Sequence, residues 1–178
     1  MSSNPQRGRT PRSSRRRIYE LEVSLLSGPV TDEFIQASPT VCRTIQIRGD
    51  QTLATLHEAI FDAFDRWDEH MYEFQVGGKA PMDPQARRYV LSIPGDPVAD
   101  AAGEVAKTTL NSLKLKTGAV FGYWFDFGDD WWHQVSVMAI HDGPGSGEYP
   151  RVTARVGDSP PQYGEYDEEE GDEDYEEG

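Results

Sequence analysis

The chain has 178 residues, of which 37% are hydrophobic and 27% are charged, and its formal net charge at pH 7 is −14. This length allows one domain with a sizeable core and leaves little room for a second. The acidity argues against a general nucleic-acid-binding face, because an acidic surface repels phosphate groups.

The two ends of the chain differ from the rest in composition. Residues 1–17 contain six arginines and no acidic residue, whereas residues 165–178 contain ten acidic residues and no basic one. Neither stretch has enough apolar side chains to offset the entropy that an ordered chain loses. We therefore predict disordered tails over 1–17 and 164–178, and one folded domain over 18–163.

Several features of the sequence predict a cytoplasmic protein. No apolar stretch approaches the roughly 18 residues of a transmembrane helix, so no membrane contact is expected. The arginine-rich start does not lead into the apolar segment of a signal peptide. The single cysteine, Cys42, cannot form a disulfide within the chain, as is typical of a reducing compartment.

The first half of the chain predicts two strands and a helix. Residues 18–26 alternate apolar and polar side chains, which is typical of a half-buried strand, and residues 41–47 repeat the pattern. From Thr52 onward, apolar side chains recur at the spacing of an amphipathic helix. Thr52 is the expected N-cap, and the helix is expected to end near Trp67.

The second half predicts further strands and a long insertion. Residues 71–76 alternate again, and residues 80–107 have the composition of an inserted loop with a short strand at 89–93. The two most apolar strands are predicted at 119–127 and 131–140. Beyond them, glycine and proline dominate and indicate irregular structure.

This order of elements predicts an α+β fold of the β-grasp type. In such a fold a mixed sheet carries one main helix packed across it, and here a C-terminal β-hairpin follows. The comparison with β-grasp proteins concerns the fold alone and implies no function.

An acidic turn joins the last two predicted strands. Their apolar stripes reach one core only if odd-numbered residues pair with odd-numbered ones. The sequence therefore predicts that Phe127 lies opposite Trp131 and Phe125 opposite His133. The turn would then be a three-residue loop, Gly128-Asp129-Asp130, whose residue types suit a hairpin.

In this register the two faces of the hairpin have different side chains. His133 faces the core, whereas Asp126 points to the outer face beside Trp132, so these two residues would not share a proton or a metal ion. Trp124, Asp126 and Trp132 would form an aromatic and acidic patch suited to a basic or arginine-bearing partner. The alternative is that residues 80–107 or the C-terminal segment cover this patch.

Two stretches, TLATLHEAIFDAFDRWDEHMYEF (52–74) and TTLNSLKLKTGAVFGYWFDFGDDWWHQV (108–135), resemble the Ri-plasmid ORF-three-like family. This family includes a TnpR-like passenger protein of an insertion element, and the resemblance covers about residues 18–163. The positions that carry it include His57, Trp67, His70, Phe74, Asp126, Phe127, Gly128, Asp129, Asp130, Trp131 and His133. The resemblance implies a fold and a mobile-element context, but neither catalytic residues nor a cofactor, because the family has no established activity.

We expect a non-catalytic protein-interaction module with an unidentified protein partner. One alternative is a metal-dependent hydrolase that uses His70 and the hairpin from Asp126 to His133, because His and carboxylate ligands suit zinc or manganese. His57 would not take part, since its position on the apolar face of the helix predicts a hydrogen-bonded core histidine. The other alternative is a nucleic-acid accessory protein that binds through Arg12, Arg15, Arg16 and Arg17.

Overall fold

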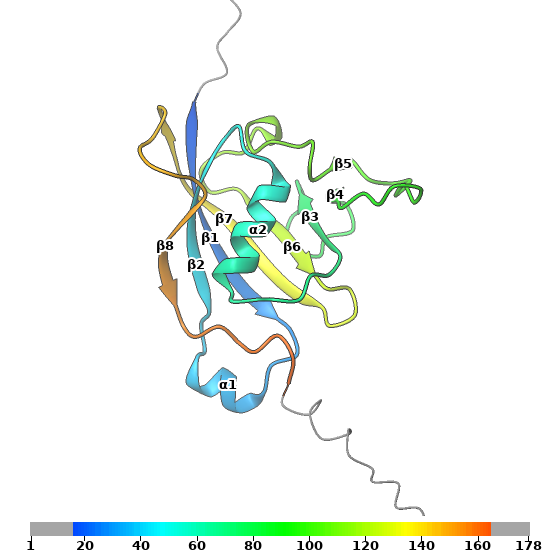
Figure 1. Ribbon diagram of the computed structural model, residues 1–178, viewed down its shortest axis with the longest axis vertical. Helices are drawn as coiled ribbons and strands as arrows, with labels where there is room; N and C mark the ends of the chain where they lie inside the picture. The colour runs from blue at the N-terminus through cyan, green and yellow to red at the C-terminus, as the bar shows by residue number, and fades with distance from the viewer. Residues whose placement is uncertain (1–15, 165–178) are drawn as a thin grey trace, which may run out of the picture.

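The structure is a computed structural model that describes residues 16–164. Within these residues, one eight-stranded sheet with the order β5-β4-β3-β6-β7-β1-β2-β8 dominates the fold. One main helix, α2 (Leu53–Ala63), lies across one side of this sheet (Figure 1). The predicted α+β class is confirmed in this general form, while the boundaries of the predicted domain and the β-grasp assignment stay predictions. The predicted tails fall almost entirely outside the described residues.

The strands vary widely in length. They are β1 (Arg17–Ser27), β2 (Cys42–Arg48), β3 (Tyr72–Val76), β4 (Arg87–Val90), β5 (Gly103–Glu104), β6 (Val120–Phe125), β7 (Trp131–Asp142) and β8 (Arg151–Val156). A short helix, α1 (Asp32–Ala37), and a 3-10 turn, η1 (Asn111–Leu113), complete the described elements. Neighbouring strands run antiparallel except for β4 and β5, which are parallel. Strand β8 was not predicted from the sequence, because its short alternation follows a stretch rich in glycine and proline.

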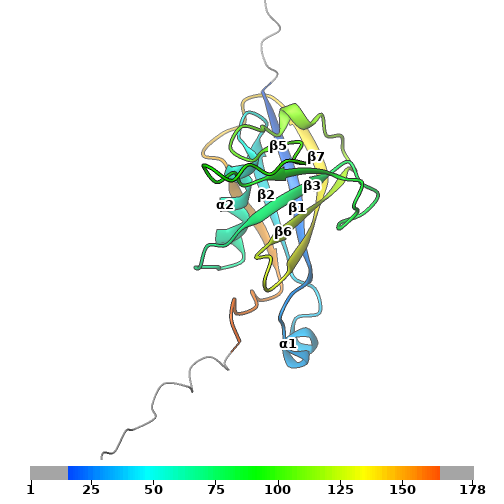
Figure 2. The same cartoon turned by 90° about the vertical axis from the view of Figure 1, so that its right-hand side faces the viewer.

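Helix α2 begins where the sequence predicts and ends earlier. The hydroxyl oxygen of Thr52 accepts a hydrogen bond from the backbone N–H of Thr55, so Thr52 is the N-cap. Leu56 and Ile60 are fully buried against the sheet. The helix stops before Asp65, whose φ of 54° lies outside the helical region, and not near Trp67. Figure 2 shows α2 along one side of the strongly twisted sheet.

The β6–β7 hairpin keeps the predicted faces but not the predicted register. Tyr123 lies opposite His133, and Phe125 lies opposite Trp131. The predicted pairing of Phe127 with Trp131 is wrong by two positions, although odd-numbered residues still pair with odd-numbered ones. Phe127 is therefore in the turn, with 40% of its surface exposed, and not in the core.

The reason for the shifted register is the backbone conformation at the two ends of the turn. Asp126 and Asp130 have φ values of 59° and 57°, which a regular strand does not allow. The backbone N–H of Asp126 donates to the carbonyl of Met71, and that of Asp130 donates to the carbonyl of Asp126. These contacts close a turn over residues 126–130, longer than the predicted three-residue loop.

Candidate functional site

The inner face of the hairpin carries a buried histidine, which contacts a buried arginine from the segment after α2. His133 is 0% exposed, and its Nδ1 lies 3.2 Å from the carbonyl oxygen of Tyr123. Its Nε2 lies 2.7 Å from Nη2 of Arg66. A carbonyl needs a donor and a guanidinium only donates, so His133 is neutral with its proton on Nδ1. Burial lowers the pKa of His133 well below its ordinary value, in agreement with this tautomer.

Arg66 is a buried cation that the sequence analysis did not single out. Its guanidinium lies about 5 Å from three aromatic ring centres, namely Phe64 at 5.2 Å, Phe125 at 4.9 Å and Trp131 at 5.0 Å. Its Nη1 is buried and forms no hydrogen bond within residues 16–164. Burial lowers the pKa of Arg66 to about 10. The aromatic rings and the acceptor nitrogen of His133 stabilise this charge, and the negative charge of Asp126 acts in the same direction.

His57 also lies in the core. Its Nε2 is 3.1 Å from the carboxylate of Glu69, and its Nδ1 is 2.7 Å from the hydroxyl of Tyr123. The carboxylate accepts from Nε2–H, so Nδ1 accepts from the tyrosine hydroxyl. The ring stacks on Tyr72 with 3.6 Å between ring centres. Burial lowers the pKa of His57 to about 3, and the nearby charge of Arg66 acts in the same direction.

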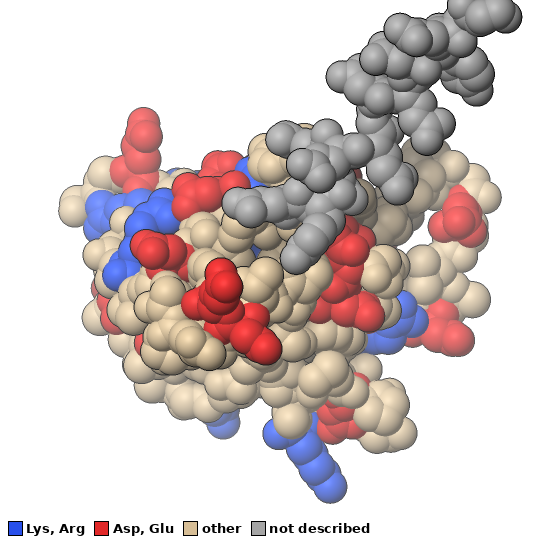
Figure 3. Space-filling view, turned by 90° about the horizontal axis from the view of Figure 1, so that it is seen from below, with Lys and Arg blue, Asp and Glu red and all other residues tan. Residues whose placement is uncertain are grey.

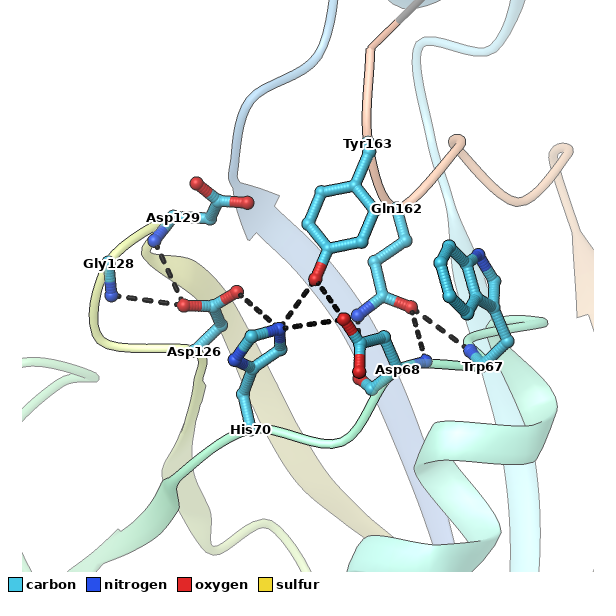
Figure 4. A network of polar contacts seen from close by, with 8 residues as sticks. All are labelled: Trp67, Asp68, His70, Asp126, Gly128, Asp129, Gln162 and Tyr163. Carbon is cyan, nitrogen blue, oxygen red and sulfur yellow. Dashed lines mark hydrogen bonds and ion pairs between the residues drawn. The ribbon is translucent and has the colours of Figure 1, made fainter. Parts of the chain in front are cut away.

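His70 lies at the hairpin end of the molecule, between carboxylates from two segments (Figure 4). Its Nε2 is 3.5 Å from Oδ2 of Asp68 and 3.5 Å from Oδ2 of Asp126. The hydroxyl of Tyr163 lies 2.6 Å from the same nitrogen and donates to Asp68 across 2.6 Å. This hydrogen bond raises the pKa of Tyr163 to about 12. The structure thus brings together His70 and Asp126, as the hydrolase alternative requires.

Asp126 connects this cluster to the turn. Its Oδ1 accepts hydrogen bonds from the backbone N–H groups of Gly128 and Asp129, at 3.0 and 3.1 Å. Its Oδ2 faces His70. One carboxylate oxygen therefore shapes the turn and the other faces the histidine, which leaves Asp126 only 6% exposed. The predicted position of Asp126 on the outer face is wrong, because its positive φ turns the side chain inward.

The C-terminal segment completes the cluster. Oε1 of Gln162 accepts from the backbone N–H groups of Trp67 and Asp68, and its Nε2 donates to the carbonyl of Asp68. Trp67 remains 72% exposed and lies edge-on against the ring of Tyr163. Asp68, Gln162 and Tyr163 were not predicted from the sequence as members of this cluster. These contacts join residues more than ninety positions apart, for which local spacing gives no signal.

The outer face of the hairpin carries an aromatic–acidic patch, which consists of Trp124, Phe127, Asp130 and Trp132. The rings of Trp124 and Trp132 stack with 4.7 Å between centres and an angle of 7°. The ring centre of Phe127 lies 4.2 Å from that of Trp124, and the indole N–H of Trp124 donates to Asp130 across 2.9 Å. Asp130 thus takes the place that the sequence analysis assigned to Asp126.

The insertion covers the sheet beside this patch. Pro81 lies against Gly122, and the backbone N–H of Met82 donates to the side chain of Gln75. Trp124 and Trp132 themselves remain half-buried, with exposed Phe127 next to them. Figure 3, which views the molecule from the hairpin end, shows several groups of acidic side chains there.

The three histidines of the family motif do not form one site in the described part of the chain. His57, His70 and His133 contact different partners, and residues 16–164 contain no group of three or more His, Cys, Asp or Glu side chains that could hold a metal ion. Phe74 is a core residue of β3. Arg12 and Arg15 fall outside the described residues, whereas Arg16 directly precedes β1 and Arg17 is its first residue. No helix among the described residues is long and apolar enough to cross a membrane.

Comparison with known proteins identifies the family. The sequence model of the plasmid pRiA4b ORF-3-like protein family matches residues 30–169. The chain belongs to this family. The predicted family is therefore confirmed, and the match includes both the turn with Asp126 and the C-terminal segment with Tyr163.

Two similar proteins extend this comparison. An uncharacterised protein, y4hQ, from Sinorhizobium fredii (strain NBRC 101917 / NGR234) is 27% identical over 125 residues, which are 70% of this chain and 59% of the relative. The chain thus spans less than two thirds of that relative's length. A crystal structure of a protein of unknown function from Methanosarcina mazei Go1 matches with a TM-score of 0.62 and 23% identity. The structural match covers 83% of this chain and 73% of the Methanosarcina mazei protein, so the two proteins share a fold.

Proposed function

We propose that this ORF-3-like protein is a non-catalytic interaction module that binds an arginine-bearing segment of a partner protein through the aromatic–acidic patch. The observation that carries this proposal is the stacked pair of Trp124 and Trp132, held by Asp130 at an accessible end of the sheet. Exposed aromatic side chains are enriched at the centres of protein interfaces.

The geometry of the patch favours arginine over lysine. A planar guanidinium stacks on an indole ring and can simultaneously form a hydrogen-bonded ion pair with a carboxylate. Trp132 offers the ring and Asp130 offers the carboxylate, while Phe127 adds apolar surface. The net charge of −14 attracts a basic segment over a longer distance.

The test is fluorescence anisotropy with a labelled arginine–glycine repeat peptide and its lysine–glycine counterpart. We expect tighter binding of the arginine peptide, and a loss of about 10-fold or more for Trp132→Ala, as for an aromatic hot spot. The matched control is Met138→Ala, because Met138 is 50% exposed on the same strand but six residues away. Equal binding by the Trp132→Ala and Met138→Ala variants would refute the assignment to this patch.

A second candidate is hydrolysis at His70. The approach of Asp68 and Asp126 to one nitrogen of His70 favours it. The absence of a three-ligand metal group among residues 16–164 and the hydroxyl of Tyr163 on the same nitrogen count against a metal-dependent reaction. We expect less than one zinc or manganese ion per chain after purification without chelator. A stoichiometric metal that His70→Ala removes from folded protein would replace the interaction proposal.

We further propose that the protein acts in the cytoplasm as an accessory of a plasmid or an insertion element. The plasmid reading frame that gives the family its description supports the first context. Fractionation of the host cell tests the location. Recovery of the protein from the membrane or periplasmic fraction would contradict it.

A further inference from the structure

A polar pocket lies where β1 begins, at the end of the sheet away from the hairpin turn. Arg17 of β1 pairs with Asp142 at the last position of β7, whereas the hairpin turn precedes the first position of β7 (Figure 1). The pocket has a volume of about 440 Å³, and its lining includes Arg16, Arg17, Arg48, Asp50 and Asn111. Three arginines thus meet in a molecule whose net charge is strongly negative.

The backbone brings these side chains together through a short chain of hydrogen bonds. The carbonyl of Arg17 accepts from the N–H of Gly49 across 2.8 Å, and the carbonyl of Gly49 accepts from the N–H of Asn111 across 2.9 Å. A Cβ atom at Gly49 would lie 2.1 Å from Oδ1 of Asn111. Only glycine therefore allows the amide of Asn111 to lie this close to the end of β2.

The pocket presents N–H donors that lack acceptors. Nε of Arg17 is buried without a hydrogen-bond partner within residues 16–164, and the carboxylate of Asp142 lies 3.5 Å from it. Arg48 uses Nε for Asp50, and its two terminal nitrogens form no hydrogen bond within the described part of the chain. Oδ1 of Asn111 already accepts from a tyrosine hydroxyl, so its NH₂ group remains as a donor.

We propose that this pocket binds a phosphate group of a nucleic-acid strand, held by the guanidinium groups of Arg17 and Arg48 and the amide of Asn111. A phosphate accepts several hydrogen bonds at once and suits the fork of a guanidinium. The carboxylates that pair with these arginines are largely exposed, with 79% of the Asp142 side chain and 67% of the Asp50 side chain accessible, and such pairs are weak enough to exchange for a phosphate.

The charge distribution points to a nucleic-acid strand as the source of the phosphate. Residues 1–17, which lead into the pocket, contain six arginines and no acidic residue. A row of positive charges matches the row of phosphates along a strand, whereas a small phosphorylated molecule offers only one or a few. The described residues closest to the acidic C-terminal stretch, 159–164, lie at the other end of the molecule (Figure 1).

The test is fluorescence anisotropy of labelled single-stranded and duplex DNA and RNA with the full-length chain, over salt concentrations from about 50 to 200 mM. Arg17→Gln and Arg48→Gln each remove one pocket charge. Arg87→Gln is the matched control, because Arg87 is exposed on β4 and its loss changes the net charge equally. Circular dichroism verifies that each variant is folded.

We expect salt-sensitive binding by the wild type, and about 10-fold weaker binding by Arg48→Gln and Arg17→Gln at low salt, with Arg87→Gln unchanged. The plot of log affinity against log salt should become shallower by about 0.9 for a duplex or about 0.7 for a single strand per lost contact. Absence of nucleic-acid binding by the wild type, or equal binding by Arg48→Gln and Arg87→Gln, would overturn the proposal.

Two further arms separate the pocket from other sources of binding. In one, a full-length variant replaces Arg7, Arg9, Arg12 and Arg15 by Gln. If it loses all binding while Arg48→Gln retains it, the N-terminal arginines bind alone and the pocket assignment fails. In the other arm, inorganic phosphate is titrated calorimetrically. Tight binding of inorganic phosphate without binding of DNA or RNA would assign the pocket to a small ligand and overturn the nucleic-acid source.

Discussion

The two faces of the β6–β7 hairpin use similar side chains for different purposes. On the inner face, Trp131 and His133 are fully buried, and the histidine has hydrogen-bond partners on both ring nitrogens. On the outer face, Trp132 is half-buried and stacks on Trp124 beside exposed Phe127. The inner face is therefore enclosed within the chain, although the indole N–H of Trp131 and Nη1 of Arg66 have no hydrogen-bond partner among residues 16–164. The outer face instead leaves ring surface for another molecule.

This difference shows that one short motif serves both the fold and the surface. Trp131 and Trp132 are adjacent in sequence, and the two-residue period of a strand places them on opposite faces. A family match over this stretch therefore does not by itself indicate a reactive site. Four substitutions, in order of decreasing expected effect, test this difference between the two faces.

The largest effect is expected for His133→Leu. The change removes the acceptor for Nη2 of Arg66, whose Nη1 has no hydrogen bond within residues 16–164. Leaving a buried donor of a charged group without its acceptor typically costs about 3 kcal/mol or more. Urea unfolding of the variant should show this loss, while Gln134→Ala, on the opposite face, should change the free energy of unfolding by less than about 0.5 kcal/mol. A loss below 1 kcal/mol for His133→Leu would mean that the aromatic rings alone stabilise Arg66.

The sequence predicts the inner face better than the turn. The alternation in β1 and the helical spacing after Thr52 reflect a single core, so they can be recognised without the structure. The conformation of Asp126 depends on backbone contacts with Met71 and on its own side chain, which leave no periodic signal. The contacts of Gln162 and Tyr163 join distant segments, and no local pattern predicts such pairs.

The next effect is expected at Asp126. Asp126→Ala removes the acceptor of two backbone N–H groups and leaves alanine at a φ of 59°, which together should cost about 2–3 kcal/mol. Asp126→Asn keeps an oxygen for the turn and tolerates this φ, so its cost should stay below about 1 kcal/mol. Chemical unfolding measures both variants. Equal losses would show that the charge facing His70 matters more than the turn.

His57 is expected to make the free energy of unfolding depend on pH, with a smaller change for each pH unit than the two substitutions above. Its pKa is lowered to about 3, so between pH 6.5 and 3 the unfolded chain binds a proton that the folded chain excludes. The free energy of unfolding should therefore decrease as the pH falls through this range, with His57 contributing about 1.4 kcal/mol per pH unit. His57→Asn should reduce this slope in urea titrations at several pH values. The exposed His141→Asn variant is the control, and an equal reduction there would refute the assignment to His57.

The smallest effect on stability is expected for Trp132→Ala. Trp132 is half-buried and loses mainly its stacking on Trp124, which is worth about 1 kcal/mol. The neighbouring Trp131→Ala should cost about 3–5 kcal/mol, because Trp131 is fully buried. Its ring also lies so close to Gly28 that no larger residue fits there. Thermal and urea unfolding of this matched pair compare the two faces directly. If Trp132→Ala costs as much as Trp131→Ala, the outer patch belongs to the core and is not available to a partner. If it costs little and still abolishes peptide binding, the stacked rings serve the interaction and not the fold.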